Sequence, residues 1–224
     1  MIMRCAIFDL DGTLVDTAPD LVAVANDMLA EMGAGPLDET TGRLAAGRGA
    51  RALLTAGLSA AGRPLPDEDV WPALVEDFIA RYQTRMSALS RPFPGVPELL
   101  EELRGQGLAL AVCTNKREML AVDLLDALGL AEYFDAIVGG DTLPEKKPHP
   151  APVEWAAAQA GLLPHAAVMV GDSRADMAAA KAAGSLPVLA AWGYVAQPLD
   201  AYGAAHVITA PRDLHGVLRK RGNA

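Results

Sequence analysis

A short apolar run followed by two closely spaced aspartates, residues 5–13 (CAIFDLDGT), constrains the fold of this chain more than any other stretch. The apolar run is too short for a helix and has the length of a buried strand. Asp9 and Asp11 follow it, and in extended backbone alternate side chains point the same way. Gly12 permits the sharp turn that would keep both acids at the end of the strand. In an open α/β sheet ligands bind at the carboxyl ends of strands, so the stretch predicts a reactive site there.

The pairing of the two acids indicates chemistry. Two neighbouring carboxylates repel each other unless a cation lies between them or one of them is protonated. Either arrangement is useful, because one acid can act as a nucleophile and metal ligand while the other moves a proton. The alternative is an acidic turn without a chemical role. The specificity of the five-residue pattern, placed directly after an apolar strand, disfavours that alternative.

Composition and charge limit the class of protein. Of the 224 residues, 51% are hydrophobic and 21% are charged, so the chain can bury a sizeable core. The net charge of −9 argues against a nucleic-acid partner. It does not exclude a small phosphorylated substrate, because a metal ion and one or two local cations can reverse the field inside a cleft. Cys5 and Cys113 lie in apolar runs, which predicts buried, reduced thiols.

The N-terminal sequence lacks the basic-then-apolar pattern of a secretion signal, and no apolar run reaches membrane-spanning length. We therefore expect a cytoplasmic protein with no membrane partner. We expect it to be a monomer or a homodimer.

Residues 18–89 differ in pattern from the rest of the chain. Apolar residues recur at helical spacing after 18, again through 50–58 and again from 75 to 86, and the stretch contains no pattern typical of a strand. Gly47-Arg48-Gly49 interrupts the helical pattern, and the proline-rich segment 91–95 returns the chain to a different organisation. The sequence predicts a helical cap domain at 18–89, inserted into a core formed by 1–17 and 90–224.

The core alternates short apolar runs with helical segments. Strands are expected at 5–8, 108–113, 136–138, 167–170, 187–190 and 206–208, and helices at 116–128, 153–160 and 175–183. Continuous apolar strands that alternate with helices are typical of a parallel sheet covered on both faces. The expected fold class is therefore α/β, a doubly wound, Rossmann-like parallel sheet with an inserted all-helical cap.

Three more of these strands end in polar residues. Thr114 and Asn115 follow one strand and suit a phosphate, although a plain helix cap is the alternative. Lys147, held by the proline after it, can neutralise an oxyanion, although a solvated loop lysine is the alternative. Asp172 follows the strand 167–170, where it could share a cation with Asp9, and Asp176 lies one helical turn later, where it could fix the cation's ligands from behind. Capping of the helix is the alternative, and it would explain Asp176 alone but not Asp172 and Asp176 together. All four sets fall at one edge of the predicted sheet.

These four sets resemble the four motifs of the haloacid dehalogenase superfamily: DLDGT at 9–13, TN at 114–115, KPHP at 147–150 and GDSRAD at 171–176. The cap between the first and second motifs resembles that of the helical-cap subgroup. The segments KKPHP at 146–150, FPGV at 93–96 and AKAAG at 180–184 are similar to phosphoglycolate phosphatases within it. The resemblance covers nearly the whole chain.

The resemblance implies a magnesium-dependent phosphomonoester hydrolase. Asp9 would be the nucleophile that forms an aspartyl-phosphate, and Asp11 would protonate the leaving alcohol and then activate water. Magnesium would be held by the Asp9 carboxylate, the Asp11 backbone carbonyl and Asp172, with Asp176 behind them. Thr114 and the Asn115 backbone would bind the phosphoryl oxygens, and Lys147 would span nucleophile and phosphate. Lys146 competes for this last role, and Lys147 is chosen because it immediately precedes the proline.

The substrate implied is a small phosphorylated metabolite, first of all 2-phosphoglycolate. The alternatives within the superfamily are a phosphatase for a sugar phosphate or pyrophosphate and a sugar phosphomutase. Dehalogenases of the superfamily would lack an acid at position 11, so Asp11 argues against carbon–halogen cleavage. A phospho-accepting signalling module is the alternative from another class, but such a module needs neither the helical insertion nor the second acid.

Substrate choice is expected to lie in the cap, because the core motifs serve many substrates. Arg48 lies between two glycines that suggest a turn. Phosphoglycolate carries a carboxylate, for which arginine is a natural planar partner. Arg48 is therefore the first candidate for substrate recognition, ahead of Arg43 and Arg51. The alternative is that all three are solvent-facing helix residues.

Overall fold

The computed structural model describes residues 3–196 and 198–220 and divides into two compact units. The core unit comprises Met1–Val15 and Pro92–Ala224, and the helical unit comprises Asp16–Arg91. The helical unit extends slightly beyond the predicted insertion at both ends. The chain passes between the units at β2 (Val15–Asp16) and β3 (Arg91–Pro92), which pair as a short two-stranded sheet.

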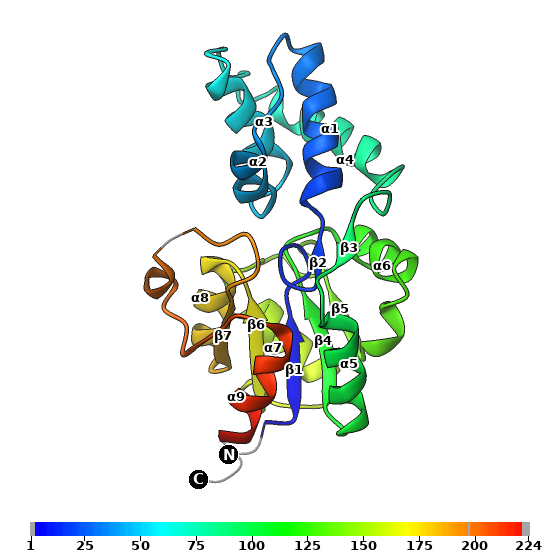
Figure 1. Ribbon diagram of the computed structural model, residues 1–224, viewed down its shortest axis with the longest axis vertical. Helices are drawn as coiled ribbons and strands as arrows, with labels where there is room; N and C mark the ends of the chain where they lie inside the picture. The colour runs from blue at the N-terminus through cyan, green and yellow to red at the C-terminus, as the bar shows by residue number, and fades with distance from the viewer. Residues whose placement is uncertain (1–2, 197, 221–224) are drawn as a thin grey trace. The chain divides into compact units, whose positions relative to one another are not determined.

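A six-stranded sheet forms the centre of the core unit, and neighbouring strands in it run parallel. Their order is β5-β4-β1-β6-β7-β8, and Figure 1 labels these strands from β5 to β7. The strands are β1 (Cys5–Phe8), β4 (Ala109–Cys113), β5 (Ala136–Val138), β6 (Ala167–Gly171), β7 (Leu186–Ala190) and β8 (His206–Ile208). The chain winds outward from β1 to β5 on one side and from β6 to β8 on the other. The winding therefore reverses at β1, and ligands bind beyond the carboxyl ends of strands at such a position.

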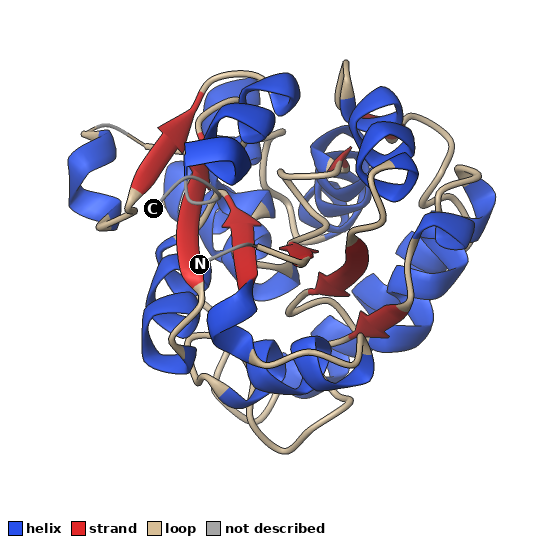
Figure 2. Ribbon diagram, turned by 90° about the horizontal axis from the view of Figure 1, so that it is seen from below, coloured by secondary structure: helices blue, strands red, loops and turns tan. Residues whose placement is uncertain are grey.

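Helices cover both faces of this sheet (Figure 2). They are α5 (Val96–Gly105), α6 (Glu118–Ala127), α7 (Ala151–Gln159), α8 (Arg174–Ala183) and α9 (Leu214–Lys220). On one face Ile7, Ala111 and Met169 pack in one buried cluster with Val153 of α7 and Ala180 of α8. The predicted doubly wound α/β fold is confirmed, and the continuous apolar character of the strands follows from burial on both faces.

The helical unit is built from α1 (Ala18–Glu31), α2 (Glu39–Ala46), α3 (Ala50–Ala60) and α4 (Trp71–Gln83). A buried acid ties the two ends of this unit together. The Asp20 carboxylate in the first turn of α1 accepts hydrogen bonds from the backbone N–H groups of Leu89 and Ser90 and from the Ser90 hydroxyl. This contact closes the loop of the insertion, so the helices can form one compact body between the two crossing strands.

Both cysteines are buried and carry free thiols, as the sequence predicts. Burial raises the pKa of each thiol, in Cys5 and in Cys113, to about 12. Among the helices of the described residues, none has both the length and the apolar character that crossing a bilayer requires.

Candidate active site

Three buried carboxylates meet at the carboxyl edge of the sheet. Asp9 follows β1 directly, Asp172 follows β6, and Asp176 lies in the first turn of α8. One oxygen from each carboxylate lies within 4.8 Å of the others. Their exposed fractions are 9%, 4% and 0%. The structure therefore brings together three of the acids that the sequence singled out.

Lys147 supplies the positive charge in this group. Its Nζ lies 2.6 Å from Asp176 Oδ1 and 3.0 Å from Asp9 Oδ1, and it donates to the Cys113 carbonyl at 2.5 Å. The side chain is buried, whereas Lys146 beside it is exposed. Of the two lysines that compete for this place in the sequence, Lys147 is the one that contacts Asp9.

The burial of these charges shifts their proton affinities. Burial, together with the charge of Asp176, raises the pKa of Asp9 to about 7, although Lys147 opposes the shift. Burial and the charges of Asp9 and Asp176 also raise the pKa of Asp172 well above its ordinary value. For Lys147, burial lowers the pKa, but the two neighbouring carboxylates outweigh this effect and the net shift is upward. Three acids against one lysine leave the fully ionised group with an excess of two negative charges.

The donor set fits a hard divalent cation. A charge of +2 would balance the excess, and carboxylate oxygens are ligands that magnesium prefers. Within the described residues, no histidine or cysteine belongs to this group of acids, which disfavours zinc. The acidic cluster therefore suits magnesium at the position where the sequence predicts it.

Asp176 accepts hydrogen bonds on both of its carboxylate oxygens. Its Oδ2 accepts from the Ser173 backbone N–H at 2.9 Å and from the Ser173 hydroxyl at 2.6 Å, in a capping box at the start of α8. Its Oδ1 accepts from Lys147. Gly171 makes this approach possible, because a Cβ there would lie 2.4 Å from Asp176 Cγ. Asp176 thus caps its helix, as one of the two sequence interpretations had it, and it also fixes Lys147.

Asp11 lies apart from the three clustered carboxylates. Its two carboxylate oxygens accept from Lys116 Nζ at 3.0 and 3.2 Å. Gly12 after it has a φ of +82°, which confirms the predicted turn. Lys116 was not among the predicted site residues. Its position directly after Thr114 and Asn115, at the same strand end, is the signal that would have found it.

Thr114 and Asn115 form the loop between β4 and α6 and do not cap that helix, since its N-cap is Arg117. Thr114 is buried, and its hydroxyl accepts from the Lys116 backbone N–H at 3.2 Å. The Asn115 side chain donates to the Lys147 carbonyl at 2.9 Å. The loop after β4 is therefore tied to the loop that carries Lys147.

A second feature that sequence reasoning missed is the segment 192–194, which follows β7. The Tyr194 backbone N–H donates to Asp172 Oδ2 at 2.7 Å, and Trp192 Nε1 donates to the Thr13 carbonyl at 3.0 Å. A glycine between two aromatic residues, one residue after a predicted strand, is the only sequence signal of this contact.

Arg48 lies in the helical unit, in the short connection between α2 and α3, and is exposed. Gly49 beside it has a φ of +83°, which bears out the turn expected there. Arg43 pairs with Asp16 at 3.0 Å, and Arg51 pairs with Glu68 at 2.5 Å. Arg51 also stacks on the Trp71 ring at 4.7 Å. Two of the three candidate arginines are therefore engaged within their own unit.

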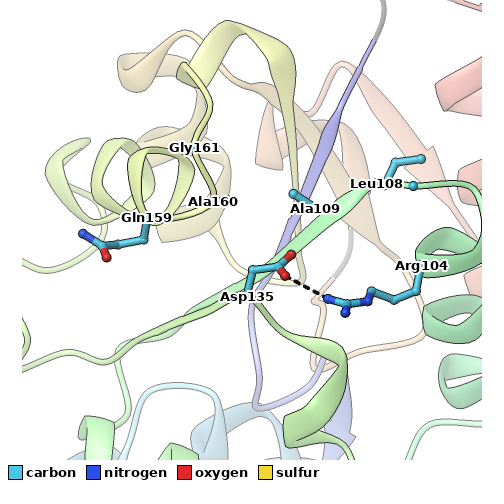
Figure 3. A pocket seen from close by; sticks show the side chains of 8 residues that line it. Arg104, Leu108, Ala109, Asp135, Gln159, Ala160 and Gly161 are labelled. Carbon is cyan, nitrogen blue, oxygen red and sulfur yellow. Dashed lines mark hydrogen bonds and ion pairs between the residues drawn. The ribbon is translucent and has the colours of Figure 1, made fainter.

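A shallow depression lies at the opposite, amino-terminal edge of the sheet (Figure 3). The two charged side chains in it, Arg104 and Asp135, bond each other at 2.9 Å, and Asp135 also accepts from the Leu110 backbone N–H. Its charged groups are thus used in holding β4 and β5 to α5. The reactive side chains gather instead at the carboxyl edge.

Comparisons with known proteins bear on the family of this chain. A family model described as haloacid dehalogenase-like hydrolase matches residues 6–190. The chain is 48% identical over 201 residues to a phosphoglycolate phosphatase of Caulobacter vibrioides, covering 90% of this chain and 84% of that protein. It is 43% identical over 192 residues to a phosphoglycolate phosphatase of Neisseria meningitidis serogroup A, covering 86% of this chain and 82% of that protein.

A solved structure shares the fold over nearly the whole chain. The crystal structure of a predicted phosphoglycolate phosphatase from Haemophilus somnus 129PT matches with a TM-score of 0.86 and 33% identity, covering 96% of this chain and 97% of that one. The resemblance that the four motifs predicted is confirmed. The chain belongs to the haloacid dehalogenase-like hydrolase family.

Proposed function

We propose that this protein is a magnesium-dependent phosphomonoester hydrolase that acts through an aspartyl-phosphate on a small metabolite, 2-phosphoglycolate. One observation carries the proposal. The Asp9 carboxylate contacts Lys147 Nζ at 3.0 Å within a buried acidic cluster, and a second acid, Asp11, follows two residues later. A nucleophile, a cation to neutralise the phosphoryl oxygens and a proton carrier are the parts that phosphoryl transfer requires.

In the first step an oxygen of Asp9 attacks phosphorus, and the bond from phosphorus to the substrate's bridging oxygen breaks. Asp11 gives a proton to that oxygen, which leaves as an alcohol. Lys147 faces the nucleophile and is placed to offset the charge on the transferring phosphoryl group. Thr114 and the Asn115 backbone bind its remaining oxygens.

In the second step water attacks the phosphorus of the aspartyl-phosphate. Asp11, now ionised, accepts a proton from this water, and the bond between phosphorus and the Asp9 oxygen breaks. Phosphate leaves and both acids return to their starting states. The same side chain therefore serves as acid in one step and as base in the other.

Magnesium would be held by the carboxylates of Asp9 and Asp172 and by the Asp11 carbonyl, with Asp176 behind them. When bound, it supplies charge neutralisation for the attacking and transferring oxygens. Asp176 holds Lys147 and the start of α8, so its part is to keep the other groups in place.

The substrate is proposed from the relatives and from the helical unit. Proteins named phosphoglycolate phosphatase cover most of this chain at 40–48% identity, which supports the same substrate here. We propose that the helical unit, 16–91, acts as the cap that excludes water and selects the leaving group, with Arg48 recognising the substrate carboxylate. The protein is expected to act in the cytoplasm as a monomer or homodimer, without nucleic-acid or membrane partners.

The rival substrates are a sugar phosphate and pyrophosphate, and the rival reactions are a phosphomutase and a phospho-accepting module. A panel of phosphorylated metabolites, assayed for phosphate release with magnesium, separates them. We expect 2-phosphoglycolate to give the highest kcat/KM and para-nitrophenyl phosphate to be turned over. No release of phosphate from any member would contradict an enzyme, and a preferred sugar phosphate would replace the proposed substrate.

A further inference from the structure

The segment Trp192-Gly193-Tyr194, which we call the aromatic clamp, contacts both the loop after Asp11 and the carboxylate of Asp172. We propose that the aromatic clamp is a positioning element that sets the affinity of the acidic cluster for its divalent cation. The proposal rests on the proposed function, because it concerns the cation of that same site. The clamp residues do not touch the reacting atoms, so they would act through Asp172 and the loop at 12–13.

Two hydrogen bonds connect the clamp to strand ends that are distant in sequence. The Tyr194 backbone N–H donates to Asp172 Oδ2 at 2.7 Å, and this bond is buried. Trp192 Nε1 donates to the Thr13 carbonyl at 3.0 Å. The first bond restricts rotation of a carboxylate that follows β6, and the second holds the turn that follows Asp11. The clamp therefore fixes two parts of the acidic edge relative to each other.

The backbone of the clamp approaches these parts so closely that no side chain fits between them. A Cβ on Gly193 would lie 2.1 Å from the Gly12 carbonyl oxygen and 2.5 Å from Asp172 Cβ. A Cβ on Gly12 would lie 2.2 Å from Asp172 Oδ2 and 2.8 Å from Tyr194 Cδ2. Real Cβ contacts this short are essentially never seen, so the three segments form one close-packed contact.

The aromatic rings anchor the clamp on the core unit. The Tyr194 ring is buried and meets the Phe93 ring edge-on, with centroids 6.5 Å apart and an interplanar angle of 60°. Trp192 is half-buried and uses its indole N–H in the bond to Thr13. The aromatic side chains thus give the backbone N–H of Tyr194 a fixed direction toward Asp172.

Such outer contacts matter for a metal ligand, because they orient it before the cation arrives. Losing a partner that orients a ligand typically weakens metal binding by about 10–100-fold. Trp192 is one contact further from the cation than Tyr194, so we expect a loss near the lower end of that range. The loss should appear in cation binding itself and not only in turnover.

The test compares two tryptophan substitutions by isothermal titration of the whole protein with Mg²⁺. Trp192→Phe keeps an aromatic ring and removes the N–H that Thr13 accepts. Trp155→Phe is the matched control, since Trp155 is exposed on α7. We expect a magnesium dissociation constant about tenfold higher in Trp192→Phe and an unchanged constant in Trp155→Phe. Equal constants in wild type and Trp192→Phe would overturn the proposal.

Hydrogen exchange of the unmodified protein gives a second, independent measurement. Because binding stabilises the state in which the clamp is formed, Mg²⁺ should slow amide exchange in a peptide covering 191–196. Exchange that does not respond to saturating Mg²⁺ would count against the clamp. A wild-type protein that binds no Mg²⁺ would instead contradict the proposed function, so the two failures are distinguishable.

Discussion

The ammonium group of Lys116 lies 3.0 and 3.2 Å from the two carboxylate oxygens of Asp11, while Lys147 lies 3.0 Å from Asp9. The two acids of the DLDGT stretch are thus each paired with a separate lysine from a separate loop. This arrangement resolves the repulsion that two close carboxylates would suffer. It also assigns each acid its own environment, which two acids with different tasks require.

Replacing Lys116 by Met should impair the proton transfers assigned to Asp11. The side chain of Lys116 is 6% exposed and that of Asp11 17%, so the pair is largely shielded from solvent and the lysine fixes the carboxylate. We expect kcat/KM for 2-phosphoglycolate to fall by about tenfold, a fraction of the 10²–10⁴ that general acid catalysis contributes. The kcat/KM for para-nitrophenyl phosphate should fall less, because its leaving group needs no proton.

The control for that substitution is Lys146→Met, which removes an exposed lysine next to the site. It should leave both substrates unaffected. A Lys116→Met enzyme that loses the same factor on both substrates would show that Lys116 supports the loop and not the proton carrier.

Asp9→Asn should abolish hydrolysis, since an amide is a poor nucleophile of nearly the same shape. We expect kcat to fall by more than about 10³-fold with the far-ultraviolet circular dichroism spectrum unchanged. Asp126→Asn, which changes an exposed acid near the end of α6, serves as the control and should retain full activity. Substantial turnover by purified Asp9→Asn enzyme would show that Asp9 is not the nucleophile.

Activity should depend on Mg²⁺. The cluster of Asp9, Asp172 and Asp176 offers only hard oxygen ligands, so EDTA should abolish phosphate release and added Mg²⁺ should restore it. Ca²⁺ should inhibit, because its looser coordination disturbs the alignment of the attacking oxygen and phosphorus. An enzyme that keeps full activity after exhaustive chelation would refute a metal-dependent mechanism.

The elements at the carboxyl edge differ in how much of them the sequence alone could reveal. The acids at 9 and 172 follow apolar strands directly, and the alternation of strands and helices places the carboxyl ends of these parallel strands at one edge. Their meeting could therefore be predicted without coordinates. The choice of Lys147 over Lys146 depended on the proline that follows Lys147, because a loop has no periodicity that fixes which side chain turns inward.

Lys116 has a sequence signal, because it stands at the same strand end as Thr114 and Asn115. The contacts of the aromatic clamp could not be predicted in the same way. The bond from Trp192 to Thr13 joins residues 179 positions apart, and the clamp depends on close backbone approach at Gly193 and Gly12. Neither the bond from Trp192 to Thr13 nor the close approach at Gly193 has a signature in the local sequence. Motifs report residue types at strand ends, whereas such contacts depend on how neighbouring loops pack.

The stability of the metal-free protein should fall as pH rises from about 4 to about 7. Asp9 has a folded-state pKa of about 7 against an ordinary value of 3.8, and the pKa of Asp172 is also raised. In that window the folded protein binds more protons than the unfolded one, so the free energy of unfolding decreases with pH. Urea unfolding in EDTA at several pH values measures this dependence.

Two comparisons isolate the contribution of the cluster to that pH dependence. Asp9→Asn should make the decrease in the free energy of unfolding between pH 5 and pH 8 smaller, because the variant lacks the carboxyl group whose pKa is raised. Mg²⁺ should stabilise the wild type more at pH 8 than at pH 5, since the cation binds the ionised acids. A pH dependence identical in wild type and Asp9→Asn would contradict a raised pKa at Asp9.

Substrate choice is the prediction that tests the helical unit. Arg48 is exposed in the connection between α2 and α3, beside a glycine with positive φ, whereas Arg43 and Arg51 pair with Asp16 and Glu68. Arg48 is therefore the first of the three to test. Arg48→Ala should raise KM for 2-phosphoglycolate about tenfold or more, as expected for losing a charged hydrogen bond worth ~1.5–3 kcal/mol.

The comparison substrate for Arg48→Ala is para-nitrophenyl phosphate, which has no carboxylate and should show little change in KM. Arg51→Ala is the control variant, because it removes an arginine three positions along that is already held by Glu68 and Trp71. It should leave the KM of both substrates near the wild-type values. Equal losses by Arg48→Ala on both substrates would assign Arg48 to folding or closure of the cap. An unchanged KM for both substrates would show that Arg48 is a solvent-facing residue without a part in recognition. The choice of 2-phosphoglycolate would then rest on the relatives alone.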